Sequence, residues 1–363
     1  MTSHRIRVLI IDEAILSRDA LNRALDDAND IEVVGMAPNA HTGLARTRQL
    51  HPDLILVRAP LSDVSPEHFV AEATRDDPDL GLLLVAAPTC AEDDLDGVVR
   101  LLEAGAFDCV LEPDLPPTDS QFVAALRLRL LPKIRAFSAA RYSRVARGLS
   151  QNPDKKASAN AAARRLQRRR SADRWELLAI AVSTGGPEAL RELLPALRAF
   201  PIPIAIVIHL PGAFTGSLAR SLDKMSSLHI AEATDGTVLR AGEARISAGG
   251  RHLLIDRNAG GKLITRTSDA PPENGFRPSA DVLFRSGAAT RSKVLALIMT
   301  GMGKDGVQGL EVLKAAGSSY VIAQDEQSSV VWGMPGAAVR AGVTDEVLPL
   351  AGIAERLREL VKT

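Results

Sequence analysis

The stretch that decides the fold is Leu177–Leu190, LLAIAVSTGGPEAL. Its apolar run ends abruptly at Ser183, and a glycine pair followed by Pro187 then opens a helical pattern. This order predicts a buried strand, a tight turn and a helix with proline at its first position, where the missing N–H costs nothing. Such a turn lifts the Ser183 hydroxyl above the sheet edge and aims it at the positive end of the helix.

A strand, a glycine turn and a helix can also bind phosphate, so two chemistries compete for this loop. Neither GxGxxG nor GxxxxGKS/T occurs within residues 177–190. The residues therefore favour a nucleophilic serine over a phosphate loop. A nucleotide-binding enzyme remains the alternative, and a nucleotide thermal-shift screen would separate the two.

A nucleophilic serine needs a base and an orienting acid, and both candidates lie downstream. Three histidines follow Ser183, namely His209, His229 and His252. His209 comes directly after the apolar run 202–208, and this position favours it, because active sites of open α/β sheets lie beyond the carboxyl ends of strands. The acid candidate is Asp305, which lies in a glycine-rich loop after another apolar run.

Five further motifs follow STGGPEAL in order: HLPGAFTGSLARSLD, AGGRHLL, RPSADVLFRS, LIMTGMGKDG and AQDEQSSVVWGMP. Together they resemble the catalytic domain of the chemotaxis protein-glutamate methylesterases, the CheB family, over residues 177–360. The resemblance implies a triad of Ser183, His209 and Asp305. It also implies that Thr184 and Met302 lie at the site, with Met302 offering a backbone N–H to the oxyanion. The chain order Ser, His, Asp differs from the orders in chymotrypsin, subtilisin and the α/β-hydrolases, which supports a separate fold with convergent chemistry.

The resemblance implies hydrolysis of glutamate γ-methyl esters on the cytoplasmic helices of chemoreceptors, with release of methanol. Glutamine deamidation would pass through the same acyl-enzyme. This chemistry needs neither a metal nor an organic cofactor. Besides the methylated receptor, a chemosensory kinase or an adaptor protein is a candidate partner. A non-catalytic signalling scaffold that keeps the fold is the alternative function.

The first part of the chain alternates short apolar runs with amphipathic stretches, which predicts a second parallel sheet. The five strand candidates are 7–11, 31–34, 54–57, 82–85 and 109–111. RVLIIDEAILSRDAL and IEVVGMAPNA resemble the response-regulator receiver domains attached to methylesterases, over residues 6–135. The expected fold class is α/β, with two doubly wound parallel-sheet domains: a receiver-like, flavodoxin-type domain and a methylesterase catalytic domain.

The phosphorylation residues that the receiver resemblance implies are mostly replaced. The acidic pair after the first strand is present as Asp12 and Glu13, but Arg58 stands where the phosphate-accepting aspartate is expected. Ala86 replaces the hydroxyl residue after the fourth strand, and Glu112 replaces the lysine after the fifth. Because arginine offers no carboxylate to phosphate or Mg²⁺, we expect a pseudo-receiver in which Arg58 pairs with Asp12, Glu13 and Glu112.

Length and charge agree with two domains and a connector. We expect a receiver-like domain at 1–135, a basic helix and linker at 136–172, and a methylesterase domain at 173–363. Residues 1–120 hold 9 Lys/Arg against 23 Asp/Glu, whereas residues 121–175 hold 15 against 2. A long helix is expected over 120–148, followed by a polar linker that lies along the acidic domain or in solvent. Nucleic-acid binding is not expected, because no aromatic residues interleave with the arginines.

The cysteines and the apolar runs bear on the compartment. Cys90 and Cys109 are too few for a disulfide framework, suit a reducing cytoplasm and belong to no Cys/His cluster, so no metal site is expected. No apolar run is long enough to span a bilayer, and no signal-peptide pattern opens the sequence. The sequence therefore predicts a cytoplasmic protein without direct membrane insertion.

Overall fold

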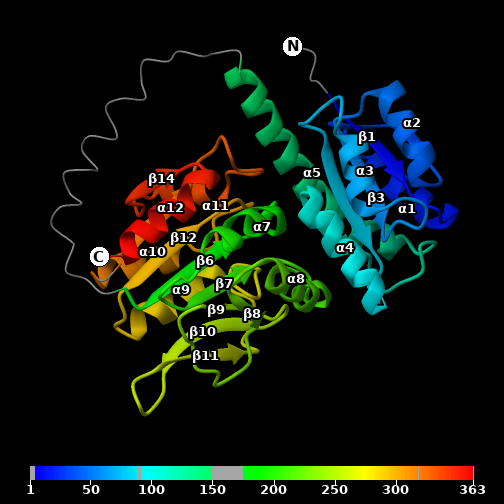
Figure 1. Cartoon of the computed structure of the whole chain (residues 1–363). Helices are drawn as coiled ribbons and strands as arrows, with labels where there is room; N and C mark the ends of the chain where they lie inside the picture. The colour runs from blue at the N-terminus through cyan, green and yellow to red at the C-terminus, as the bar shows by residue number, and fades with distance from the viewer. Residues whose placement is uncertain (1–4, 89–90, 149–174, 318, 363) are drawn as a thin grey trace. The chain divides into compact units, whose positions relative to one another are not determined.

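In the computed structural model the chain forms two compact units, residues 1–142 and residues 143–363 (Figure 1). The structure describes residues 5–88, 91–148, 175–317 and 319–362. The expected polar linker and Cys90 lie outside these ranges, and the domain bounds at 135 and 172 stay predictions. Within the described ranges every helix is too short or too polar to span a bilayer.

The first unit is a five-stranded parallel sheet with the order β2-β1-β3-β4-β5. Its strands are β1 (Ile6–Ile11), β2 (Ile31–Ala37), β3 (Leu54–Ala59), β4 (Gly81–Ala86) and β5 (Asp108–Leu111). Its helices are α1 (Ile15–Asp26), α2 (Ala40–Leu50), α3 (Pro66–Ala73), α4 (Glu92–Ala104) and α5 (Ser120–Gly148) as far as residue 142. This order is the flavodoxin-like doubly wound topology, in which ligands bind beyond the carboxyl ends of β1 and β3.

Short-range signals start the helices of this unit. Asn39 caps α2 by accepting a hydrogen bond from the Thr42 N–H, and Ser65 caps α3 with Pro66 in the first turn. The long helix α5 covers the expected range and continues through Pro132 and through residue 135.

The second unit contains a seven-stranded parallel sheet with the order β14-β13-β12-β6-β7-β9-β8. Its strands are β6 (Leu177–Val182), β7 (Ile204–Ile208), β8 (His229–Glu232), β9 (Glu243–Ile246), β12 (Val294–Ile298), β13 (Ser319–Gln324) and β14 (Glu346–Leu348). Its helices are α7 (Gly186–Ala196), α8 (Gly212–Met225), α9 (Ala280–Ala289), α10 (Val307–Ala315), α11 (Met334–Arg340) and α12 (Leu350–Val361). A separate antiparallel hairpin joins β10 (His252–Arg257) to β11 (Leu263–Ser268).

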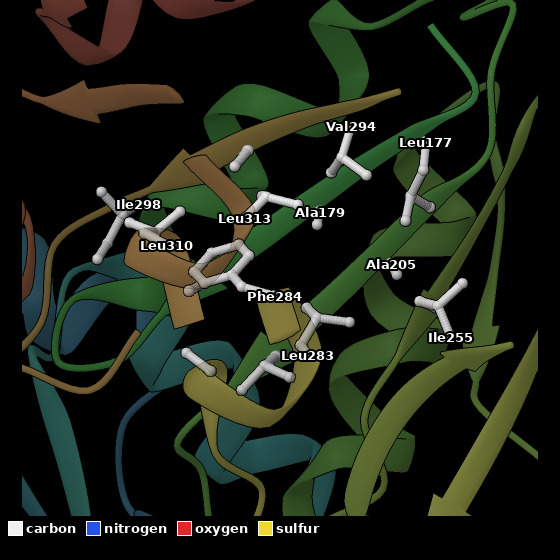
Figure 2. Packing of buried hydrophobic residues seen from close by; sticks show 14 of the residues in the cluster. Leu177, Ala179, Ala205, Ile255, Leu283, Phe284, Val294, Ile298, Leu310 and Leu313 are labelled. Atoms are coloured by element: carbon white, nitrogen blue, oxygen red, sulfur yellow. The ribbon is translucent and has the colours of Figure 1, made fainter. Parts of the chain in front are cut away.

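One face of the second sheet is lined by small side chains, because successive residues of a strand point to opposite faces. Alanines at 179, 181, 205, 296 and 323 belong to the buried cluster on this face. Figure 2 shows Phe284 of α9 and Leu310 and Leu313 of α10 in the same cluster as Ala179 and Ala205. The small strand residues let both helices approach the sheet closely, which sets the position of their first turns.

The prediction of two doubly wound α/β domains is confirmed by these two sheets. In the second sheet the chain leaves β6 toward β7 on one side and later returns to β12 on the other. The carboxyl end of β6 therefore lies at a topological switch point, where sites of open α/β sheets form.

Candidate active site

Three neighbouring strands end at the same edge of the second sheet, and each is followed by a predicted site residue. In the register of β6 and β7, Val182 pairs with Ile208, so Ser183 and His209 follow as the next pair of neighbours. The His209 N–H donates to Val182 O (3.2 Å), and the Ser183 N–H donates to Thr300 O (2.9 Å) beyond the end of β12. Ser183 therefore lies between the ends of β7 and β12.

The turn after Ser183 depends on glycine. Gly185 has a φ of 77°, and a side chain there would come within 2.6 Å of a Val330 methyl group. The Gly186 N–H closes the turn on Ser183 O at 2.7 Å, and α7 begins at Gly186, one residue earlier than the proline predicts. The tight turn at Gly185 thus holds Ser183 next to the N-terminus of α7, as the strand–turn–helix pattern indicates.

His209 and Asp305 are joined directly, although 96 residues separate them. His209 Nε2 lies 2.8 Å from Asp305 Oδ2. His209 Nδ1 is buried, and no described residue is its hydrogen-bond partner. Because the carboxylate binds Nε2–H, the neutral ring leaves Nδ1 as the nitrogen that can accept a proton. Among the described residues no hydrogen bond joins Ser183 Oγ to this nitrogen; such bonds often form only when substrate is bound.

The Asp305 carboxylate is held at the start of α9. Oδ1 accepts hydrogen bonds from Ser279 Oγ (2.7 Å) and the Asp281 N–H (3.2 Å), and Oδ2 accepts one from the Ala280 N–H (2.7 Å). Burial raises the pKa of Asp305, but the bonds from His209 and from these donors outweigh it and leave the pKa below its ordinary value. The group is therefore an ionised carboxylate with a fixed orientation.

Glycines pack the loop after β12 against Ser183. The Gly301 N–H donates to Val331 O (2.9 Å), and a side chain on Gly301 would come within 2.7 Å of Ser183 Cβ. A side chain on Gly333 would meet the Met302 Cα at 3.1 Å, so only glycine allows this approach. The backbone at Met302 is thereby fixed, and its N–H has no acceptor among the residues that the structure describes.

Thr184 is buried beside this loop, and its carbonyl accepts a hydrogen bond from Thr300 Oγ1 at 2.9 Å. The other two histidines lie elsewhere. His229 is exposed and pairs with Asp223, whereas His252 is buried and contacts Pro271 O and the Ser279 N–H. Of the three histidines, the structure brings only His209 to Asp305.

Sequence reasoning missed two residues of this site. Ser279 caps the carboxylate of Asp305, and Phe276 stacks on the His209 ring. The Asn-Gly pair at 274–275 is a strong hairpin-turn signal and could have identified the loop that carries Phe276.

In the first unit the predicted receiver residues gather at the carboxyl end of the sheet. Arg58 donates to Glu112 and to Ser17 Oγ (3.0 Å) and lies 3.7 Å from Asp12 Oδ2. Ser17 Oγ in turn lies 2.6 Å from Asp12 Oδ2 and 2.9 Å from Glu112 Oε1. The expected pairing of Arg58 with Glu13 is wrong, because Glu13 is exposed and accepts a hydrogen bond from Ser62.

Burial dominates the electrostatics of this arginine–carboxylate cluster, which consists of Arg58, Asp12, Ser17 and Glu112. Burial raises the pKa of Asp12, and the opposing effect of Arg58 is smaller. Burial lowers the pKa of Arg58, but Glu112 outweighs it and leaves that pKa raised. Ala86 ends β4 as a fully buried residue and contributes no hydroxyl. Among the described residues, no group of three acidic, histidine or cysteine side chains could hold a metal ion.

Comparison with known proteins assigns the chain to a family. A sequence model described as CheB methylesterase matches residues 178–357. Relatives called protein-glutamate methylesterase/protein-glutamine glutaminase include one from Trichodesmium erythraeum, 34% identical over 97% of this chain and 98% of its own. Another, from Desulfotalea psychrophila, is 37% identical over 98% of this chain and 99% of its own. The solved CheB methylesterase catalytic domain of Thermotoga maritima is 40% identical, with 52% of this chain and 99% of that domain covered and a TM-score of 0.50. The chain therefore belongs to the CheB methylesterase family.

Proposed function

We propose that this protein hydrolyses glutamate γ-methyl esters on the cytoplasmic helices of chemoreceptors, and that it also deamidates glutamine. The family and the names of its relatives support both activities. The observation that carries the proposal is the His209–Asp305 hydrogen bond, which leaves Nδ1 buried at the strand end next to Ser183, with no hydrogen-bond partner among the described residues.

In the proposed first half-reaction Ser183 Oγ attacks the ester carbonyl carbon while His209 Nδ1 takes the hydroxyl proton. The Asp305 carboxylate keeps the proton of the neutral ring on Nε2 and stabilises the imidazolium that forms. The carbonyl oxygen becomes an oxyanion, and the Met302 N–H is a candidate donor to it, next to Thr184. The imidazolium then gives its proton to the methoxide oxygen, the carbon–oxygen bond breaks, and methanol leaves an acyl-enzyme.

In the second half-reaction water replaces the alcohol. His209 Nδ1 takes a proton from water as its oxygen attacks the acyl carbon, and the same proton returns to Ser183 Oγ when the acyl bond breaks. The product is a free glutamate side chain. A glutamine side chain would follow the same steps with ammonia as the leaving group, so one site can perform both reactions.

Methanol release from a methylated receptor fragment tests the proposal. The full-length protein should release methanol, and the Ser183→Ala variant should not, while both keep the same melting temperature. Methanol release by a folded Ser183→Ala protein at the wild-type rate would contradict the proposed nucleophile.

We further infer that the receiver domain does not perform phosphoryl transfer and that phosphorylation does not control the esterase. Receiver chemistry requires a carboxylate nucleophile at the end of β3, and Arg58, the second-last residue of that strand, places its guanidinium there beside Asp12 and Glu112. The guanidinium supplies a positive charge beside these two buried carboxylates, at the position where a receiver carries its carboxylate nucleophile, and offsets one of their two negative charges.

A small-molecule phosphodonor with Mg²⁺ tests this inference in the full-length protein. We expect unchanged esterase activity and no added phosphate by mass spectrometry. A stoichiometric phosphate on residues 6–130, or activation by the phosphodonor, would contradict it. The phosphate measurement does not depend on whether methanol is the product.

A further inference from the structure

The ring of Phe276 lies flat against the imidazole of His209. Their centroids are 4.3 Å apart, and the ring planes differ by 17°. The Phe276 ring is half-buried, and the His209 side chain is only 9% exposed. The stack leaves the ring edges free, so Nε2 bonds Asp305 while Nδ1 stays available.

The loop that carries Phe276 has a defined shape. The Glu273 N–H donates to Phe276 O (3.0 Å) and the Phe276 N–H donates to Glu273 O (2.9 Å), which closes a two-residue turn. Asn274 and Gly275 both have positive φ, 52° and 86°, as a type I′ turn requires. Arg285 of α9 binds both carboxylate oxygens of Glu273, at 2.9 and 2.6 Å. The turn is therefore anchored to the helix whose first residues hold Asp305.

His252 ties the two ends of this loop together. Its Nδ1 accepts the Ser279 N–H at 3.2 Å, so its Nε2 carries the hydrogen that is donated to Pro271 O at 3.1 Å. The ring is 2% exposed and lies at the start of β10. Residues 271–279 thus form a closed loop, which holds the Phe276 ring on one side of the imidazole and Ser279 on Asp305 at the other end.

We propose that Phe276 is a positioning residue for His209, which rests on the proposed role of His209 as the base. The aromatic ring limits rotation of the imidazole about its Cβ–Cγ bond and keeps water from that face. When His209 takes the Ser183 proton, it becomes a cation on the electron-rich face of the phenyl ring. A cation on an aromatic ring at this distance is attracted more strongly than a neutral group, so the stack favours the charged transition state.

Aromatic and aliphatic replacements of Phe276 separate this role from simple packing. Phe276→Leu keeps an apolar side chain but removes the π face, whereas Phe276→Tyr keeps it. We expect Phe276→Leu to lower kcat for methyl-ester hydrolysis by about 3- to 30-fold with little change in KM, and Phe276→Tyr to retain the activity. Tyr142→Leu, an aromatic exchange at a 71% exposed position in the first unit, is the matched control and should leave kcat unchanged.

A second measurement does not depend on the receptor substrate. Covalent modification of Ser183 by a small sulfonyl fluoride requires an activated serine, and its rate should fall by a similar factor in Phe276→Leu. In the same variant the ring-proton NMR signals of His209 should lose their upfield ring-current shift.

The two measurements distinguish failure of this inference from failure of the proposed function. If Phe276→Leu is folded and keeps the wild-type rates of turnover and Ser183 modification, the positioning role is wrong while the triad stands. If KM rises or the protein loses stability with kcat unchanged, Phe276 only shapes the loop, and the inference is also wrong. If the wild-type protein neither releases methanol nor reacts at Ser183, both proposals fall.

Discussion

Replacing Asp305 by Asn tests the proposed triad sharply, because the two side chains have nearly the same shape. Each carboxylate oxygen accepts two hydrogen bonds: Oδ1 from Ser279 Oγ and the Asp281 N–H, and Oδ2 from the Ala280 N–H and His209 Nε2. An amide has a single acceptor oxygen. Its NH₂ group must therefore take the place of either Oδ1 or Oδ2 and face the hydrogen-bond donors at that position.

Both orientations of the amide impair His209. With the NH₂ group toward Ala280, Nε2 must become the acceptor, and Nδ1 then carries a hydrogen and cannot take the Ser183 proton. With the oxygen toward Ala280 the tautomer is kept, but the imidazolium loses its negative partner and the NH₂ group faces the Asp281 N–H. We expect kcat to fall about 10³- to 10⁴-fold, which is about 4 to 5.5 kcal/mol of transition-state stabilisation. The displaced hydrogen bonds should cost only about 1–3 kcal/mol of folding stability.

Methanol release and thermal unfolding, measured on the same samples, check this prediction. Asp281→Asn is the matched control, because the Asp281 side chain accepts the Gly309 N–H at 2.7 Å and, among the hydrogen bonds of the described residues, makes none to His209. It removes a buried carboxylate beside Asp305 and should keep kcat within a few-fold of wild type. A folded Asp305→Asn protein whose kcat stays within about tenfold of wild type would refute the reasoning.

Three further predictions follow from the same contacts. Ser183→Ala and His209→Ala should each abolish methanol release, and the double variant should lose no more than either, because the two residues act as one unit. Arg58→Asp should not restore activation by a phosphodonor, which phosphate incorporation checks. It should lower the melting temperature of the first unit, measured by calorimetry, because it adds a carboxylate to a buried acidic cluster. Burial raises the pKa of Asp281 to about 6, so the folded state binds this proton more tightly than the unfolded chain, and stability is lost as pH rises through this range. Asp281→Asn should therefore melt higher than wild type above about pH 6 and lose this advantage near pH 4, as thermal unfolding across pH would show. An equal difference at both pH values would contradict the assigned pKa.

The local chemistry of the strands and turns could be predicted from the sequence. Each apolar run of the first 111 residues became a strand of the parallel sheet, and the helix expected over 120–148 has those bounds. The end of β6 and the turn at Gly185 followed from one short stretch, because an apolar run favours a buried strand, glycine permits the positive φ of the turn and proline fixes φ at the helix start. Such signals depend only on near neighbours in the chain.

The order of strands in the sheet, by contrast, is a property of the folded chain. The placement of β6 between β7 and β12 makes Ser183 a neighbour of His209 and brings Asp305, 96 residues away from that histidine, to its Nε2. The sequence suggested which residues meet, but it could not say which ring nitrogen the carboxylate binds. That choice depends on the start of α9, where Ser279 and two backbone N–H groups orient the carboxylate.

The two missed site residues, Ser279 and Phe276, and the wrong pairing of Arg58 with Glu13 have the same cause. Each depends on contacts between residues that are distant in the chain. Arg58 was expected to bind Glu13, but Ser17 of α1 completes the cluster, because α1 turns that hydroxyl toward Asp12 and Glu112. Phe276 reaches His209 only because His252 and Arg285 hold a loop between β11 and α9. The sequence by itself determined the strands, the turns and the candidate chemistry, since these arise from local backbone preferences and residue types. Only the tertiary structure decided which side chains touch, since contacts between distant residues depend on how the helices pack on the sheet.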